Sequence, residues 1–178
     1  MIVPFEHSGR QMHQLCWVVP DLRASIDQWV KLKGAGPFFL FENVRFEEAL
    51  YRGEPVDFPN ITAAIGQMGE VQIELVSHTD ERPSFFSEVV PHGTTGFHDI
   101  AYYCNDYDRD LAIYTEAGVE VAFSAARQGI RTCWVDTTPN LGFMVQLAER
   151  SALMDGVFGM IRDAARGWDG SDPIRTLG

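Results

Sequence analysis

Four side chains that could bind a metal ion stand at matching places in the two halves of this 178-residue chain. His13 and His98 each precede an apolar run, while Glu74 and Gln146 each lie between apolar neighbours in a later run. A carboxylate in such a strand is costly to bury unless its face borders water or a cavity. Two imidazoles, a carboxylate and a carboxamide oxygen, brought together, would form an open site for a divalent ion.

The spacing of these residues indicates an internal repeat, and such a repeat determines the fold of the whole chain. His98 follows His13 by 85 positions, and the same interval separates Asp21 from Asp106. Helical spacing of apolar residues begins after each aspartate, and both aspartates can cap the helix that follows. Each half therefore reads as a strand, a helix and three further strands.

Runs of β-branched and aromatic residues predict the strands, and apolar residues at three- and four-position steps predict the helices. Residues 53–60 contain two prolines and are expected to form a loop. An apolar stripe over 151–168 predicts a helix packed on the outside of the sheet, and 175–178 should be loose. We expect strands at 12–19, 38–41, 44–51, 61–67, 70–77, 97–104, 119–125, 131–136 and 142–148, helices at 22–33, 108–117 and 151–168, and a helical turn at 85–90.

Composition narrows the class of protein. With 14 basic and 25 acidic residues the formal charge is −11, which disfavours nucleic acid because phosphate binding needs clustered Lys and Arg. No apolar run approaches the roughly 20 residues that span a bilayer, and the first residues lack the pattern of a secretory signal, so we expect a cytoplasmic protein without a membrane partner. Cys16, Cys104 and Cys133 lie in apolar runs, which indicates buried free thiols.

The duplicated unit, with a histidine before its first strand and Glu or Gln in its last strand, resembles the vicinal oxygen chelate superfamily. This superfamily includes glyoxalase I, methylmalonyl-CoA epimerase, extradiol dioxygenases and metal-free bleomycin-resistance proteins. The resemblance covers residues 11–149 and is closest to the glyoxalase and epimerase branch. It implies an α+β fold in which two β-α-β-β-β modules form a curved, half-open eight-stranded sheet around a metal site. The implied parts of this one compact domain are a first module at 11–77, a linker at 78–95, a second module at 96–149, and a C-terminal helix and tail at 150–178.

The resemblance also implies a ligand set for a divalent metal ion, which could be zinc, nickel, cobalt, manganese or iron. Its histidine motifs match His13 and Gly96-Phe97-His98, and its Ile-Glu-Leu-like strands match Ile73-Glu74-Leu75 and Val145-Gln146-Leu147. The implied ligands are His13, Glu74, His98 and Gln146. Two features depart from the pattern. Relatives often carry two consecutive histidines where this chain has His98-Asp99, and the epimerase pattern has its amide in the first half rather than the second.

By this resemblance, the protein is a metal-dependent isomerase, epimerase or lyase that stabilises an enolate during proton transfer next to a carbonyl group. With one charged ligand the ion keeps net positive charge and can act as a Lewis acid. Glu74 is the one carboxylate of the set, so it is the expected catalytic base. Glu54 and Asp57, in the loop before the third strand of the first half, are candidates for a second base.

Two other functions on the same fold stay open. An extradiol-type dioxygenase would use His13, His98 and Glu74 as a facial triad for ferrous iron. A metal-free binding or resistance protein would use an aromatic pocket alone. The aromatic residues of the interior favour a small-molecule substrate that is apolar or carries an acyl group. We expect a homodimer, and the sequence leaves open whether the site lies within one chain or across two.

Overall fold

The structure is a computed structural model that describes residues 11–58, 61–78 and 81–176. One sheet carries its strands in the order β11-β2-β5-β6-β1-β7-β10-β9-β8-β3-β4. The strands are β1 (Gln11–Val18), β2 (Phe38–Val44), β3 (Glu47–Tyr51), β4 (Glu54–Pro55), β5 (Ile61–Met68), β6 (Val71–Ser77), β7 (Gly96–Cys104), β8 (Val121–Arg127), β9 (Ile130–Val135), β10 (Met144–Glu149) and β11 (Ile174–Thr176). The helices are α1 (Leu22–Lys33), α2 (Phe85–Val89), α3 (Tyr107–Glu116), α4 (Thr138–Leu141) and α5 (Ala152–Ala164).

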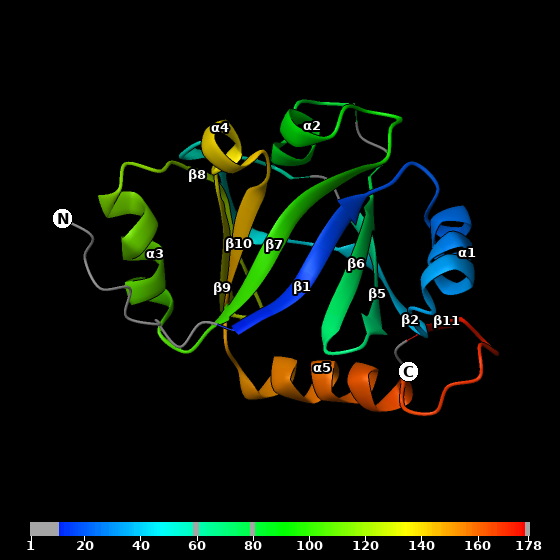
Figure 1. The fold of residues 1–178 in the computed structure, drawn as a ribbon. Coiled ribbons are helices and arrows are strands. Elements are labelled where there is room, and N and C mark those ends of the chain that lie inside the picture. Colours follow the sequence, from blue (N-terminus) through cyan, green and yellow to red (C-terminus); the bar gives the residue numbers. More distant parts are fainter. Residues whose placement is uncertain (1–10, 59–60, 79–80, 177–178) are drawn as a thin grey trace.

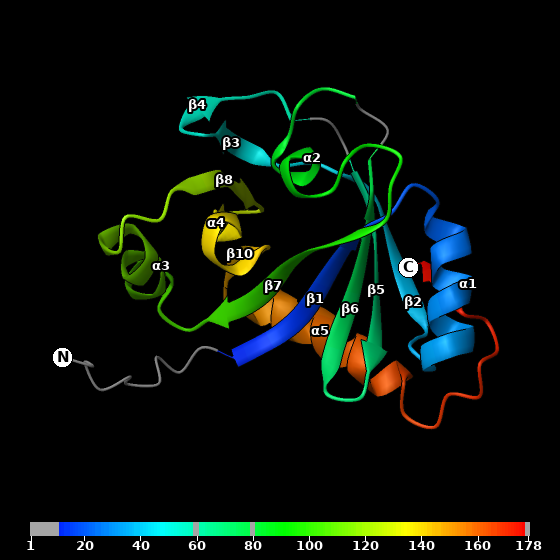
Figure 2. The ribbon, with the colours of Figure 1, turned by 45° about the horizontal axis from the view of Figure 1, so that its top comes forward.

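Eight of these eleven strands, β1, β2 and β5 to β10, form the expected curved, unclosed sheet (Figures 1 and 2). The other three extend its two edges. β1 and β7 run antiparallel at its centre, and each has a parallel partner from its own half of the chain, β6 and β10 respectively. For these eight strands, the two halves of the chain thus contribute the two halves of the sheet. The α+β class and the half-open sheet predicted from the sequence are confirmed.

The other three strands are β3, β4 and β11. The predicted strand at 44–51 contains β3, whereas the expectation of a loop throughout 53–60 was wrong for residues 54 and 55, which pair with β3. β4 lies within the predicted loop at 53–60, and β3 pairs with β8 of the second half. Residues 174–176 pair with β2 as a parallel strand, although 175–178 were expected to be loose. That expectation was wrong for 175 and 176, because β2 offers them a free edge, while 177 and 178 lie outside the described residues.

Helices α1 and α3 cover the convex face of the sheet. Asp21 caps α1 by accepting a hydrogen bond from the Ala24 backbone N–H, and Asp106 caps α3 in the same way through Arg109. Ile26 of α1 is fully buried in a cluster that includes residues of β2 and β6. Capping and one apolar stripe therefore attach each helix to its own half of the sheet.

The C-terminal helix takes a different position from the one predicted. α5 runs across one open end of the curved sheet rather than over its outside (Figure 1). Ile161 is fully buried with Phe39 and Ile65, while Val157 and Phe158 face the interior space of the sheet. The expectation of an outside helix was wrong, because the curved sheet leaves its own concave apolar surface uncovered and α5 closes it.

Two β-bulges in the central strands determine which side chains face inward. In the pairing of β1 with β7, Met12 lies opposite Tyr102 and Gln14 opposite Ala101, so His13 has no partner. Farther along, the register shifts again between Cys16 and Trp17. A bulge adds one residue to a strand and re-aims its neighbours.

The second shift leaves His98 without a partner, because Cys16 lies opposite Asp99 and Trp17 opposite Phe97. The bulges therefore repeat at the 85-residue interval found in the sequence. Gln14 and Cys16 consequently face the concave side, whereas Trp17 packs against the α1 side.

The interior agrees with the sequence at the three cysteines, but only in part at the seven apolar residues that the repeat predicts to be mostly buried. Cys16, Cys104 and Cys133 are buried free thiols, as predicted. Val19 and Ile26 are buried, whereas Leu15, Trp17, Ile100, Tyr102 and Leu111 are only half-buried. None of the helices in the described part of the chain has the length and hydropathy that crossing a bilayer requires.

Candidate active site

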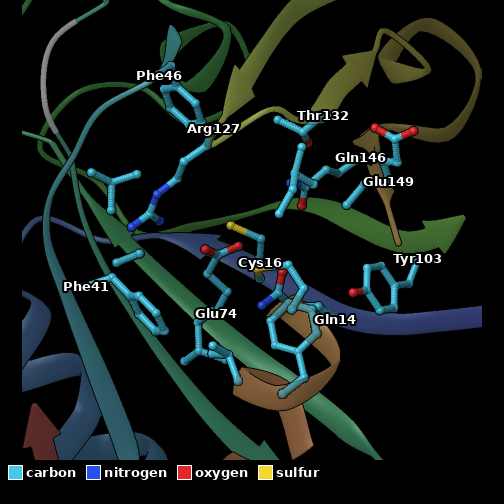
Figure 3. Close-up of a pocket in the computed structure, with 18 of the residues that line it drawn as sticks. Gln14, Cys16, Phe41, Phe46, Glu74, Tyr103, Arg127, Thr132, Gln146 and Glu149 are labelled. Carbon is cyan, nitrogen blue, oxygen red and sulfur yellow. The ribbon is translucent and has the colours of Figure 1, made fainter. Parts of the chain in front are cut away.

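A cavity of about 280 Å³ lies on the concave side of the sheet. Its wall comes mainly from β1, β2, β5, β6, β9, β10 and α5, with single residues from α2, β7 and β8, and most of that wall is apolar. Figure 3 shows the polar side chains that reach it, among them Glu74, Gln14 and Gln146. Enclosed apolar cavities with a few convergent polar groups are the usual form of small-molecule sites, so this is the candidate active site.

Three of the four predicted ligands, His13, Glu74 and Gln146, line this cavity. His13 reaches it from the bulge in β1, Glu74 from the middle of β6, and Gln146 from β10. The parallel pairing of β6 with β1 and of β10 with β7 brings the two halves' last strands beside the central pair. The repeat thus places these three side chains on the wall of one cavity.

The fourth predicted ligand, His98, is not among the residues that line the cavity. It is fully buried beneath α2, where its ring contacts those of Phe85 and Phe86. Its Nδ1 lies 2.6 Å from Asp99 Oδ2, and its Nε2 lies 3.1 Å from the carbonyl oxygen of Phe85. Both nitrogens of His98 are therefore engaged with protein atoms.

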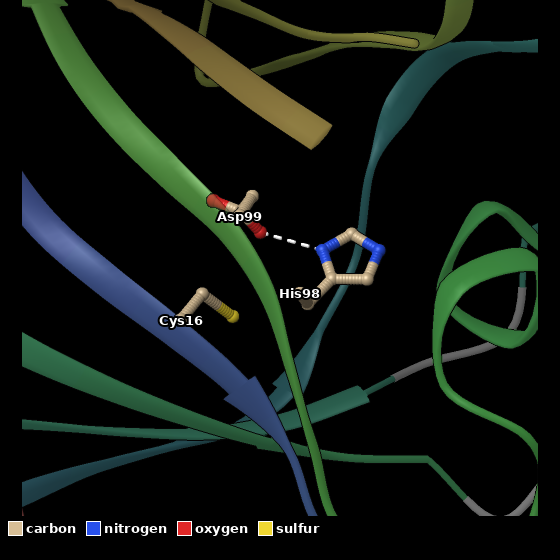
Figure 4. A group of neighbouring side chains, drawn as sticks. All are labelled: Cys16, His98 and Asp99. Carbon is tan, nitrogen blue, oxygen red and sulfur yellow. Dashed lines mark hydrogen bonds and ion pairs between the residues drawn. The ribbon is translucent and has the colours of Figure 1, made fainter. Parts of the chain in front are cut away.

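Asp99 and Cys16 form a second polar group beside the cavity (Figure 4). Ligand atoms of Cys16, His98 and Asp99 lie within 4.8 Å of one another, which is close enough for the three to hold a metal ion. Asp99 Oδ2 also accepts a hydrogen bond of 3.2 Å from Trp134 Nε1. The other carboxylate oxygen of Asp99 is buried without a hydrogen-bond partner in the described structure.

Glu74 has the most perturbed carboxyl group of the cavity. Enclosure by apolar surroundings, followed by the nearby charge of Asp99, raises the pKa of Glu74 from 4.5 to about 8. The thiol of Cys16 opposes this shift weakly by hydrogen bonding to the carboxylate. A carboxyl group with this pKa can hold or release a proton near neutral pH, which suits general acid and base catalysis.

His13 is held as a neutral imidazole. Burial lowers the pKa of His13 from 6.5 to about 4, and the charge of Asp99 offsets only part of this effect. Its ring packs against Tyr103 and Phe158, with centroid distances of 5.2 and 5.1 Å. Its Nδ1 is buried and has no hydrogen-bond partner among the described residues. Neutral imidazole with a free nitrogen is the form that binds metals.

Gln146 presents an unpaired oxygen to the same cavity. Its Nε2 donates a hydrogen bond of 3.1 Å to Thr132 Oγ1, which fixes the orientation of the amide. Its Oε1 is buried without a partner in the described part of the chain. An unpaired imidazole nitrogen, an unpaired amide oxygen and the carboxyl of Glu74 are a donor set that fits a divalent cation.

Sequence reasoning missed several polar residues around the cavity. Gln14 and Cys16 line it, and so does Arg127 at the end of β8. The alternation of β1 around Cys16 could have signalled Gln14, but the bulge at His13 cannot be read from one strand alone. The candidate second bases do not line the cavity: Glu54 is exposed on β4, and Asp57 borders a separate small pocket.

Comparison with protein families gives a match over residues 13–135 to the glyoxalase/bleomycin resistance protein/dioxygenase superfamily. The chain belongs to this superfamily. The resemblance to the vicinal oxygen chelate superfamily expected from the sequence is thereby confirmed. A search of curated proteins gave no match.

Solved structures of the superfamily share the fold at low sequence identity. Methylmalonyl-CoA epimerase from Mycobacterium tuberculosis aligns with a TM-score of 0.58 and 17% identity over 82% of this chain and 91% of that one. A methylmalonyl-CoA epimerase in complex with methylmalonyl-CoA and NH4+ aligns with a TM-score of 0.59 and 19% identity, over 80% of this chain and 96% of that one. Streptomyces coelicolor methylmalonyl-CoA epimerase in complex with 2-nitronate-propionyl-CoA aligns with a TM-score of 0.58 and 19% identity, over 80% of this chain and 98% of that one. These likenesses establish the fold of the chain.

Proposed function

We propose that this protein is an epimerase-type enzyme that moves a proton at the carbon next to a carbonyl group of a small acyl substrate. The observation that carries the proposal is the position of Glu74, a carboxyl with a pKa of about 8 on the wall of a mostly apolar cavity. The epimerases with the same fold support this reaction class. Glu74 would take the proton from the substrate and return it.

A divalent metal ion is part of the proposal. His13, Glu74 and Gln146 would hold it, since the first and last have unpaired ligand atoms at the cavity. When bound, such an ion supplies Lewis-acid stabilisation of the negative charge that develops on the carbonyl oxygen. His98, the fourth predicted ligand, would have to give up one of its two hydrogen bonds to join them. The proposal therefore rests on the three residues of the cavity wall.

The size of the cavity limits what part of a substrate it can enclose. At about 280 Å³ it lies just below the range of roughly 300–1,000 Å³ typical of sites that enclose a drug-sized ligand. An acyl group fits this space, and a large carrier such as coenzyme A would remain outside. The apolar side chains of α5, including Val157 and Phe158, would contact the acyl group and exclude water.

The proposal is tested by metal analysis together with exchange of the substrate's α-proton for deuterium in heavy water. With methylmalonyl-CoA as the probe, we expect stoichiometric metal and exchange catalysed by the wild type. Glu74→Gln should lower the exchange rate by about 10²–10⁴-fold, because the proton-transfer group is lost. Glu116→Gln, at an exposed site on α3, is the matched control and should exchange at the wild-type rate. Equal exchange by wild type and Glu74→Gln would contradict the role of Glu74.

The same material separates the two other functions. Oxygen uptake with catechols and bound iron would favour an extradiol-type dioxygenase. A protein that binds no metal and catalyses no exchange, but binds apolar acyl compounds, would be a sequestration protein. The expected homodimer is a separate proposal, which the molar mass in solution tests.

A further inference from the structure

Arg127 extends a positive charge over the candidate active site. It is the last residue of β8 and lies opposite Ile130 in the hairpin with β9. The turn between them has Gln128 and Gly129 at φ angles of 53° and 76°, a left-handed pair that is typical of tight hairpins. Arg127 is one of the residues that line the cavity, and its side chain points from the hairpin into it (Figure 3). The hairpin thus positions the guanidinium at the rim.

The other arginine of the cavity wall is already neutralised. Arg131 makes ion pairs of 2.8 Å with Glu149 and of 2.7 Å with Asp108. Arg127, by contrast, forms no ion pair with any described residue. It is therefore the cation on this wall that is free to pair with a ligand.

The charge of the whole protein makes such a cation significant. A formal charge of −11 repels anionic ligands over the surface. Arg127 is exposed at the rim, but most of the remaining cavity wall is apolar, so an ion pair on its cavity side is less screened than one in open water. An arginine guanidinium binds carboxylate and phosphate groups through two parallel hydrogen bonds.

We propose that Arg127 is the anion-binding residue of the substrate site, so that the substrate class is an acyl compound carrying an oxyanion group. This inference rests on the proposed function, and it adds the group that selects the substrate. The oxyanion would lie at the hairpin rim beside Arg127, and the apolar part would extend toward Val157 and Phe158 of α5. A neutral acyl compound of the same shape would lack the rim contact.

Binding to chelator-treated protein tests this without metal or turnover. The probes are hexanoate, hexyl phosphate and the neutral hexanamide. Calorimetry measures the affinity of the protein for each of them. We expect the wild type to bind at least one anion about 10- to 100-fold more tightly than the amide, as charge-assisted hydrogen bonds provide. The tighter of the two anions identifies the oxyanion. Arg127→Gln should remove this preference while leaving hexanamide binding unchanged, and Arg127→Lys should keep part of it.

Arg23→Gln is the matched control, because Arg23 is exposed on α1, away from the cavity, and its loss changes the net charge equally. It should keep the full preference for the anion. An Arg127→Gln protein that still prefers the anion, or a wild type with no preference, would overturn the inference. Either result would leave the exchange test of Glu74 unaffected, so failure of this inference and failure of the proposed function can be told apart.

Discussion

Gln14 and Asp99 occupy equivalent positions on the two central strands, each directly after a bulged histidine. Cys16 lies opposite Asp99 and Ala101 lies opposite Gln14, so the pseudo-symmetry of the repeat holds across the pairing of β1 with β7. Gln14 Nε2 and Asp99 Oδ1 are both buried without partners among the described residues. These two equivalent positions thus carry an amide and a carboxylate, so the repeat is symmetric in its backbone but not in these side chains.

Metal binding should distinguish the two histidines. In His13→Ala we expect the affinity for a probe such as Co²⁺ to fall by at least about tenfold. Mutation of a residue that only hydrogen-bonds to a metal ligand already lowers metal affinity by about this factor. His98→Ala should lower stability more than affinity, because His98 is buried among aromatic rings and paired with Asp99. Absorbance titration with Co²⁺ and urea unfolding measure the two effects. The opposite order would place the ion in the group formed by Cys16, His98 and Asp99.

The pH dependence of stability should report on Glu74. Its pKa is raised from 4.5 in the unfolded chain to about 8 in the folded protein. Below pH 4.5 the carboxyl is protonated in both states, and folding then pays no penalty for burying a charge. Between pH 4.5 and about 8 the carboxyl is ionised in the unfolded chain but protonated in the folded protein. The contribution of Glu74 to stability is therefore lost as the pH rises through this range.

Burial of His13 has the opposite effect up to about pH 6.5, because its pKa is lowered from 6.5 to about 4. We therefore expect the metal-free wild type to become less stable from about pH 6.5 to 8, and Glu74→Gln to lose this dependence. The difference should be on the order of a few kcal/mol. Urea unfolding in the presence of a chelator measures it. A parallel pH profile for the two proteins would mean that Glu74 is charged in the folded state.

An ion-pair network should tie the β3-β4 hairpin to the second half of the sheet. Arg52, between the two strands, contacts Glu88 at 2.5 Å, Asp136 at 2.7 Å and Glu120 at 3.0 Å. We expect Arg52→Met to lower the free energy of unfolding by about 1–2 kcal/mol, because several carboxylates share one guanidinium. The loss should be smaller at high salt, which screens these ion pairs. Glu120→Gln should cost close to nothing, since its side chain is 76% exposed. Urea unfolding at two salt concentrations tests both; equal costs would argue against a network.

The start of α5 should depend on one hydroxyl group. Tyr103 Oη donates to the carbonyl oxygen of Ser151 and accepts from its backbone N–H, each at 3.1 Å. Tyr103→Phe removes both hydrogen bonds and should cost about 1–2 kcal/mol. Hydrogen exchange should then quicken in the first turn of α5 and remain unchanged in α1. Uniform protection in α5 would show that its apolar contacts alone hold it in place.

The sequence by itself determined the duplicated architecture. Alternating and helical apolar spacing, repeated after His13 and His98, depends on short-range backbone geometry, which is why the order of strands and helices could be read directly. It also singled out His13, Glu74, His98 and Gln146, because polar residues inside apolar strands are costly to bury without a shared cavity. Three of the four predicted ligands accordingly lie on one wall.

Only the tertiary structure decided which side chains face that cavity and what closes it. A bulge exists only relative to the partner strand, so the inward turn of Gln14 and the enclosure of His98 follow from the pairing of β1 with β7. The position of α5 likewise follows from the curvature of the sheet, which leaves a concave apolar surface that an amphipathic helix can cover. Long-range pairing and curvature are properties of the assembled sheet, and no single segment encodes them.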